Sequence, residues 1–230
     1  MSPLALHSLF EGLAWIAAIA VGWWARRYID TPPLRRYPVY LLLLWLGAAT
    51  GAYALGDLNL YLAGAQGTGR SILGAIVGGI VVAEVYKAIF GIRGSTGAVF
   101  VLPLSVAIAI GRIGCFLAGL DDYTYGTSTS LPWGVDFGGG IHRHPVQLYE
   151  SLSMAGFALF FVWLLRRRPK IAAVDGFYLF VGFYGAQRFV WEFLKPYPVI
   201  AGPVNLFHLA AGALVLYAVF MLRRRKHAFA

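Results

Sequence analysis

The sequence predicts an all-α integral membrane protein with seven transmembrane helices, and three observations support this prediction. The 230 residues are 59% hydrophobic and only 13% charged, with a mean hydropathy of +0.68. Soluble domains carry about 25% charged residues, so a soluble chain of this composition would lack polar surface. Apolar stretches of ~20 residues, the length that crosses a bilayer, recur without a shift in composition. Basic residues cluster between alternate stretches. We therefore expect one polytopic membrane domain over residues 1–230.

Seven segments are candidate transmembrane helices. They cover residues 7–25, 38–56, 71–91, 97–118, 146–165, 175–194 and 204–222. The first segment contains no Lys or Arg before its apolar run, so we expect a retained helix rather than a cleaved signal peptide. Glycines such as Gly74, Gly78 and Gly79 in the third segment are typical of membrane helices that pack closely.

The positions of the basic residues predict the orientation. Fourteen of the 19 Lys and Arg residues follow the first, third, fifth or seventh segment: Arg26, Arg27, Arg35, Arg36, Lys87, Arg93, Arg166, Arg167, Arg168, Lys170, Arg223, Arg224, Arg225 and Lys226. Loops rich in Lys and Arg stay in the cytoplasm. The amino terminus is therefore expected outside and the carboxyl terminus in the cytoplasm.

Charge and cysteine content argue against other classes of protein. A net charge of +9 could suggest nucleic-acid binding, but such proteins spread basic residues over one face with aromatics interleaved, which this chain does not do. Cys115 is the single cysteine, so an internal disulfide is excluded. The five histidines show no metal-ligand spacing. We expect no nucleic-acid partner, no cofactor and no metal.

Ionisable residues remain in the outer half of the predicted bundle. The five basic residues that do not follow the orientation rule all fall there: Arg70, Arg112, Arg143, Arg188 and Lys195. Arg188 and Glu192 lie four apart and can form an ion pair, which is equally compatible with a structural and a functional role. Arg112 has no carboxylate at helical spacing, so it needs a partner elsewhere. Ionisable groups at this depth are candidates for a functional site.

The loop 119–145 and the start of the fifth helix add further polar groups at this depth. The set predicted to lie together is Arg112, Arg143, His144, Gln147, Glu150, Arg188 and Glu192. Guanidinium groups match phosphate oxygens bidentately and stay protonated, so arginines facing a dry cavity suit a phosphate. The natural anion at this depth is a phospholipid headgroup. Three other features are expected to be structural: Glu11, the Glu84–Lys87 pair and His208.

Four motifs resemble those of one known family. They are Gly111-Arg112-Ile113-Gly114, Leu131-Pro132-Trp133-Gly134-Val135, Arg143-His144-Pro145-Val146-Gln147-Leu148-Tyr149-Glu150, and the segment from Tyr184 to Phe193. From about residue 70 to its end, the chain resembles prolipoprotein diacylglyceryl transferase. That resemblance implies a seven-helix, multi-pass protein of the bacterial inner membrane. It also implies transfer of the diacylglyceryl group of phosphatidylglycerol to the lipobox cysteine of a prolipoprotein signal peptide, with release of glycerol phosphate.

The resemblance also implies roles for individual residues. Arg112 and Arg188 would hold the phosphate, and Glu192 would orient Arg188. Arg143, Gln147, Tyr149 and Glu150 would shape the substrate site, and Gly126 would close the loop after the Gly-Arg motif.

The chain departs from the family pattern on the side of the acceptor. Leu73-Gly74-Ala75 replaces His-Gly-Gly, Cys115 replaces an asparagine, and the following glutamate is lost within residues 119–122. An arginine motif of the second helix is reduced to residues 47–51, and the aromatic pair after His7 is missing. Asp121 or Asp122 could replace the glutamate, and His144 could replace the lost base.

Two alternatives stay open because of these departures. The chain could use the same phospholipid site with a different acceptor, or it could be a non-catalytic membrane protein that binds phospholipid or protein. Cys115 could be a nucleophile, but a small packing residue in place of the asparagine is the expected role.

Reporter fusions test the predicted orientation. A reporter that needs the cytoplasm should be active when fused to Ala230. A reporter that needs export should be active when inserted into the 120–142 loop, because this loop is expected outside. The reverse pattern would invert the assignment.

Overall fold

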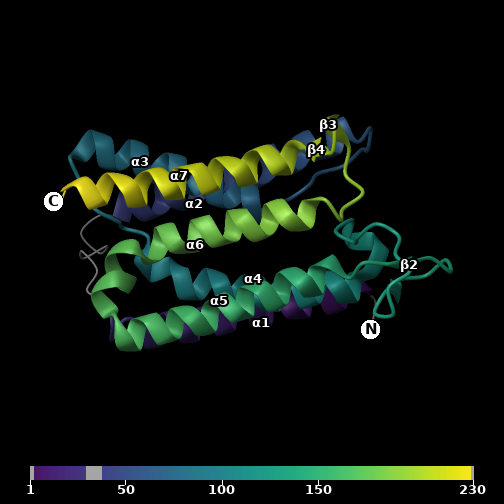
Figure 1. Cartoon of the computed structure of the whole chain (residues 1–230), viewed down its shortest axis with the longest axis horizontal. Coiled ribbons are helices and arrows are strands. Elements are labelled where there is room, and N and C mark those ends of the chain that lie inside the picture. The colour runs from purple at the N-terminus through teal and green to yellow at the C-terminus, as the bar shows by residue number, and fades with distance from the viewer. Residues whose placement is uncertain (1–2, 30–37, 229–230) are drawn as a thin grey trace.

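The computed structural model describes residues 3–29 and 38–228, and seven long helices account for most of them (Figure 1). The helices are α1 (Pro3–Ala25), α2 (Pro38–Leu62), α3 (Ile72–Phe90), α4 (Ala98–Ala118), α5 (Val146–Arg167), α6 (Pro169–Glu192) and α7 (Leu206–Ala228). They run along the long axis of the molecule, with the start of α1 and the end of α7 at opposite ends. An odd number of membrane crossings requires that arrangement.

Six of these helices are long and apolar enough to cross a membrane, and α6 is the exception. This helix lies between α7 and the pair formed by α4 and α5 (Figure 1). It carries Arg188 and Glu192, which are buried inside the protein at 4% and 1% exposure. Helix α6 is therefore less apolar over the length of a membrane span than the other six, because it carries charged side chains that face other helices. The lipid-facing sides of the outer helices carry large exposed apolar residues such as Trp15, Ile16 and Leu152. The chain is thus an all-α, multi-pass membrane protein.

The predicted segments match the observed helices, with differences at their ends. Helix α2 continues six residues beyond the predicted end, to Leu62, and its Asp57 carboxylate accepts a hydrogen bond from the Gly69 amide. Helix α6 begins at Pro169, with only Arg168 between it and the end of α5, because a proline without an N–H is suited to the first turn of a helix. Arg35 and Arg36, used in the orientation argument, lie outside the described residues.

Helices α2 and α3 are held together by glycines on both sides. Gly47 and Gly51 face Gly74 and Gly78, and a Cβ added to Gly74 would collide with the Gly51 carbonyl oxygen. Two small-xxx-small motifs thus bring the two backbones into contact. The packing role predicted for Gly74 and Gly78 is confirmed. The added Cβ of Gly79 would meet only the Ala48 methyl, at 3.9 Å.

Short irregular elements gather at one end of the helix bundle (Figure 1). They are the 3₁₀ turn η2 (Gly119–Asp122), the antiparallel pair β1 (Val135–Asp136) and β2 (His142–Arg143), and the antiparallel pair β3 (Val199–Ala201) and β4 (Val204–Asn205). In register, Val135 pairs with Arg143 and Val199 with Asn205. These elements connect the ends of α4, α5, α6 and α7, so this end of the bundle brings the predicted polar motifs together.

A pair of alanine substitutions tests the contact between α2 and α3. Gly74→Ala should lower the free energy of unfolding by about 1–3 kcal/mol, because the new methyl overpacks against the backbone of α2. Gly79→Ala should leave stability nearly unchanged, since its methyl only reaches ordinary contact distance. Thermal unfolding in detergent measures both. Equal melting temperatures for the two variants would contradict the close contact.

Candidate functional site

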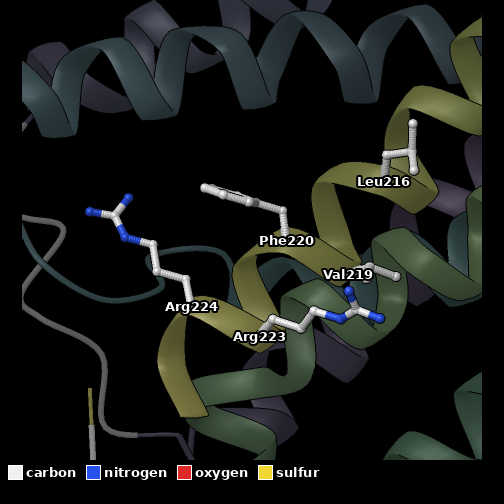
Figure 2. Close-up of a pocket in the computed structure, with 5 residues that line it drawn as sticks. All are labelled: Leu216, Val219, Phe220, Arg223 and Arg224. Atoms are coloured by element: carbon white, nitrogen blue, oxygen red, sulfur yellow. The ribbon is translucent and has the colours of Figure 1, made fainter. Parts of the chain in front are cut away.

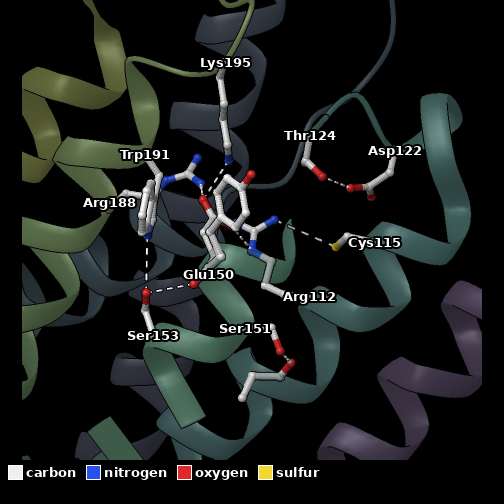
Figure 3. Close-up of polar contacts among 12 residues, drawn as sticks. Arg112, Cys115, Asp122, Thr124, Glu150, Ser151, Ser153, Arg188, Trp191 and Lys195 are labelled. Atoms are coloured by element: carbon white, nitrogen blue, oxygen red, sulfur yellow. Dashed lines mark hydrogen bonds and ion pairs between the residues drawn. The ribbon is translucent and has the colours of Figure 1, made fainter. Parts of the chain in front are cut away.

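The carboxylate of Glu150 lies between three cationic side chains (Figure 3). Its Oε2 is 2.6 Å from Arg112 Nε, and its Oε1 accepts hydrogen bonds from Arg188 Nη1 and, at 2.8 Å, from Lys195 Nζ. Glu150 is 1% exposed. Each partner comes from a different part of the chain: α4, α6 and the turn after α6. The sequence required a partner for Arg112, and Glu150 of α5 is that partner.

The network continues from Arg188 towards α7. Arg188 Nη2 lies 2.6 Å from Glu192 Oε1, so the ion pair predicted at helical spacing is confirmed. Glu192 Oε2 accepts a hydrogen bond from Asn205 Nδ2 at 3.2 Å. The Asn205 side chain in turn accepts from the backbone amide of His208 at 3.0 Å. His208 is a hydrogen-bonded core residue, as expected. We call Arg112, Glu150, Arg188, Glu192 and Lys195 the ionic network.

The ionic network carries an excess of positive charge. With Lys195 protonated it contains three cations and two carboxylates, which leaves a net charge of +1. All five residues are buried. Moving charges out of water is costly unless they are paired, so each cation of the network depends on the carboxylates.

Lys195 is the member of the network whose charge is easiest to lose. Burial, together with the positive charge of Arg188, lowers the pKa of Lys195 from 10.5 to about 8, although Glu150 and Glu192 oppose the shift. For Tyr197, two residues further along the chain, the pKa shifts upwards. Burial and the nearby Glu192 carboxylate raise the pKa of its hydroxyl, which therefore stays neutral.

Several buried polar atoms beside the ionic network have no hydrogen-bond partner within the described part of the chain. Both polar atoms of the Gln147 amide, the Tyr184 hydroxyl and Arg188 Nε belong to this group. Gln147 is fully buried and lies one helical turn before Glu150 on α5. Buried polar groups are almost always hydrogen-bonded in proteins. These atoms can therefore serve a polar ligand that enters next to the arginines.

Other predicted site residues lie outside the ionic network. The Tyr149 hydroxyl accepts a hydrogen bond from Trp133 Nε1 at 2.9 Å and lies 3.4 Å from His144 Nδ1. The guanidinium of Arg143 lies over the ring of Tyr125, 4.9 Å from its centre. The expectation that Arg143 and His144 join the arginine cluster is not matched by their contacts. Arg143 pairs in β2 and lies over Tyr125, while His144, which follows β2, faces Tyr149.

Gly126 has a structural reason to be a glycine. Its amide donates to the His144 carbonyl oxygen at 3.1 Å, and a Cβ at this position would collide with that same carbonyl. The next residue, Thr127, donates from its amide to the Leu194 carbonyl at 2.7 Å. The loop therefore joins the start of α5 to the end of α6, where Glu150 and Arg188 must meet.

Asp121 and Asp122 have different surroundings. Asp121 is exposed, whereas Asp122 is partly buried and lies 3.5 Å from His7 Nε2. The Thr124 hydroxyl donates to the other oxygen of Asp122. Of the two predicted substitutes for the family's glutamate, only Asp122 points towards other polar groups. Cys115 also has polar contacts, because its sulfur lies 3.8 Å from Arg112 Nη1.

Sequence reasoning missed three contributors to this end of the bundle. Lys195 was noted as a basic residue in the outer half, and its spacing of three from Glu192 was the signal that could have included it. Asn205 lies at the start of α7 with no charged neighbour in sequence to reveal it. His7 lies before the first apolar run, and more than a hundred residues separate it in sequence from its partners Cys115 and Asp122.

A separate groove lies on α7 near the carboxyl end of this helix, which is opposite the end of the bundle with the short strands (Figure 1 and Figure 2). Leu216, Val219, Phe220, Arg223 and Arg224 of α7 line it. Arg223 is seventeen residues beyond the start of α7, which places it roughly 25 Å along the helix axis from that start, where Asn205 contacts Glu192 of the ionic network. These arginines are among those predicted to lie at the cytoplasmic surface. The groove therefore takes no part in the ionic network.

Comparison with known proteins identifies the family. The prolipoprotein diacylglyceryl transferase family matches residues 10–224. The phosphatidylglycerol–prolipoprotein diacylglyceryl transferase of Solidesulfovibrio magneticus is 31% identical, covering 98% of this chain and 92% of that protein. The enzyme of the same name from Idiomarina loihiensis is 33% identical over 94% of this chain and 88% of its own length. The enzyme of that name from Geobacter sulfurreducens is 31% identical over 77% of this chain and 70% of its own length. The chain belongs to the prolipoprotein diacylglyceryl transferase family.

Proposed function

We propose that this protein transfers the diacylglyceryl group of phosphatidylglycerol to the lipobox cysteine of a prolipoprotein, releasing glycerol phosphate. The relatives carry this activity in their names. The reaction would take place in the bacterial inner membrane, at the outer end of the helix bundle. The observation that carries the proposal is the buried ionic network with its net charge of +1.

The net charge of the ionic network suits a phosphodiester. Phosphatidylglycerol carries one negative charge on its phosphate, and its arrival would make the site neutral. The arginines offer directional N–H donors that match phosphate oxygens. Arg188 Nε, which has no partner among the described residues, is one such donor, and the buried Gln147 amide is another. A lipid headgroup reaches this depth with its acyl chains still in the bilayer.

The same groups would stabilise the leaving phosphate. Displacement at the glycerol carbon places a second negative charge on the phosphate as its C–O bond breaks. Fixed cations in a water-poor site stabilise such developing charge without having to reorganise. Glu150 is a positioning residue in this scheme, because it holds Arg112 and Arg188 beside one another against their mutual repulsion.

The acceptor thiol must lose its proton before it attacks. A thiolate is the nucleophilic form, and a neighbouring cation or base favours it. His144 is the base proposed from sequence. Its Nδ1 faces the Tyr149 hydroxyl, so its Nε2 would be the atom that accepts the proton. This role requires the acceptor to approach from the outer loop.

A different acceptor is the second candidate function. The ionic network is complete, whereas the departures from the family pattern fall on residues such as Cys115 and the turn 119–122. A headgroup-release assay in phosphatidylglycerol vesicles detects use of the phospholipid with any acceptor. Adding a lipobox peptide then tests the prolipoprotein directly. Turnover only with other thiols would favour the second candidate, and binding without turnover would favour a non-catalytic protein.

Removal of either network arginine should abolish most turnover. We expect Arg112→Ala and Arg188→Ala each to lower kcat/KM by about 10²–10³, the effect of losing one preorganised donor. The measurement is glycerol phosphate release at matched expression and monodisperse elution. Arg70→Ala is the matched control, because Arg70 is exposed and pairs only loosely with Glu11, at 3.7 Å. Wild-type turnover in both network variants would refute the site.

The pKa of Lys195 predicts a pH dependence of lipid binding. Below pH 8 Lys195 is protonated and the ionic network carries +1, and above its pKa of about 8 the lysine becomes neutral and that charge is lost. The KM for phosphatidylglycerol should therefore rise with pH above about 8, by at most about tenfold per unit.

Lys195→Arg provides the control for this effect. Arginine keeps its charge throughout the range, so the rise in KM should disappear. A KM profile identical in the wild type and this variant would assign the pH dependence to another group.

A further inference from the structure

A second polar cluster lies beside the ionic network and is formed by His7, Cys115 and Asp122. Their possible ligand atoms, an imidazole nitrogen, a sulfur and a carboxylate oxygen, all lie within 4.8 Å of one another. His7 Nε2 is 3.8 Å from Cys115 Sγ and 3.5 Å from Asp122 Oδ1. The residues come from α1, α4 and the turn η2, so the fold creates this cluster.

The arrangement differs from that of a proton relay. In a catalytic Cys-His-Asp triad the carboxylate binds one imidazole nitrogen and the nucleophile binds the other. Here Cys115 and Asp122 both face the same nitrogen, Nε2. The three ligand atoms therefore face one another, and the imidazole does not relay a proton between its two nitrogens. Chelation of an ion requires such a convergent arrangement.

Two of the three ligand–ligand distances match the edges of a tetrahedral zinc site, and the third, from Cys115 Sγ to the Asp122 carboxylate, is at most 4.8 Å. With Zn–S of about 2.3 Å and Zn–N and Zn–O of about 2.1 Å, tetrahedral angles give ligand–ligand distances of roughly 3.6 Å for sulfur to nitrogen and 3.4 Å for nitrogen to oxygen. The corresponding distances are 3.8 and 3.5 Å. Small side-chain shifts would complete the geometry.

The surroundings hold the carboxylate in place. The Thr124 hydroxyl donates to Asp122 Oδ2 (Figure 3). The other oxygen, Oδ1, lies 3.5 Å from His7 Nε2. Hydrogen bonds of this kind orient the ligands of metal sites. His7 and Asp122 keep 24% and 16% of their side-chain surface exposed, so an ion and a further ligand can enter.

We propose that His7, Cys115 and Asp122 bind a zinc-type divalent cation and leave its fourth position open to the acceptor thiol. A thiolate, an imidazole and a carboxylate form a ligand set typical of zinc, and catalytic zinc sites combine three protein ligands with one exchangeable position. One thiolate and one carboxylate neutralise the ion. On this proposal Cys115 would be a metal ligand in place of the packing residue expected from sequence, and the chain would hold a metal that histidine spacing did not predict.

The position of Arg112 connects this site to the phospholipid. Arg112 Nη1 lies 3.8 Å from Cys115 Sγ, while Nε of the same side chain faces Glu150 (Figure 3). A thiol on the open position would thus lie next to the proposed phosphate site. The catalytic part of this inference rests on the proposed function, whereas binding of the ion does not.

The chemical step is a substitution at carbon. On binding to the ion the acceptor thiol releases its proton to water, because coordinated thiols are deprotonated. The sulfur lone pair attacks the glycerol carbon, a C–S bond forms and the C–O bond to the phosphate breaks. The electron pair of that bond leaves with glycerol phosphate. This route would take the place of His144 as the base, and it supplies a thiolate without the histidine that the family has and this chain lacks.

Metal binding can be measured without turnover. The full chain, purified in detergent without a histidine tag and stripped with chelator, should bind one equivalent of Zn²⁺. Co²⁺ should give a thiolate charge-transfer band, and since Cys115 is the only cysteine, that band reports this site alone. His7→Ala, Cys115→Ser and Asp122→Asn should each weaken Zn²⁺ binding by about tenfold or more. The Co²⁺ band should vanish in Cys115→Ser.

Two neighbouring residues provide matched controls for these variants. Asp121→Asn alters the exposed carboxylate next to Asp122, and His142→Ala alters an exposed histidine of β2. Both should bind Zn²⁺ as the wild type does. Absence of stoichiometric binding, or equal affinity in Cys115→Ser and the wild type, would overturn the proposal.

The catalytic part has its own readout. A lipobox peptide should change the Co²⁺ spectrum by entering the fourth position, and a peptide with serine in place of cysteine should not. Chelator-stripped protein should lose transfer and regain it with Zn²⁺. Full transfer by stripped protein would overturn the catalytic role and leave the proposed function standing. Metal binding that depends on Cys115, without transfer, would retain the site and overturn the proposed function.

Discussion

The contact on which this end of the molecule depends is the one between Glu150 and its three cations. Arg112, Arg188 and Lys195 converge from α4, α6 and the following turn. Without this carboxylate Arg112 would have no ion-pair partner among the described residues, and Arg188 and Lys195 would share Glu192 alone. Removing one partner of a buried pair typically costs 3–5 kcal/mol, because the other charge stays buried. The interior position of α6 follows from this constraint, since a helix that carries Arg188 and Glu192 is stable in a membrane only when other helices surround it.

Much of the fold could be predicted because its causes are local in sequence. Apolar length fixes the helices, and a spacing of four fixes the Arg188–Glu192 pair. The partner of Arg112 could not be read in the same way, because it depends on how α4 and α5 are rotated against each other. The contact of Asn205 with Glu192 could not be predicted either, because the β3–β4 pair directs this side chain inwards and no helical period describes that segment. For Lys195, in the turn after α6, the spacing of three from Glu192 was the only local signal, and its contact with Glu150 depends on tertiary packing.

The site residues that moved away from the predicted cluster share a physical cause. Sequence position placed Arg143 and His144 at the same depth as the arginines, but depth in the membrane does not determine the direction in which a side chain points. Both precede α5 in an extended segment, in which successive side chains point to opposite sides. The contacts of Gly126 and Thr127 then fix that segment against the end of α6. Asp121 and Asp122 similarly separate within a 3₁₀ turn, one to the surface and one towards His7.

Arg112 joins the two halves of the site, and this explains why the changes on one half are compatible with the other. Its Nε is held by Glu150, so the guanidinium has a fixed direction, and its Nη1 reaches the residue that stands in place of the family's asparagine. An asparagine there would offer this arginine a neutral oxygen. Cysteine offers a sulfur that can become an anion, and it lies within reach of His7 and Asp122. Without a metal the buried sulfur is a neutral thiol and adds no charge near the phosphate. When the thiolate and the Asp122 carboxylate share a divalent cation, the charge of the ion compensates the charges of these two ligands. In both states the net charge of the ionic network stays available to an anionic lipid, so a cysteine at this position is compatible with the complete network.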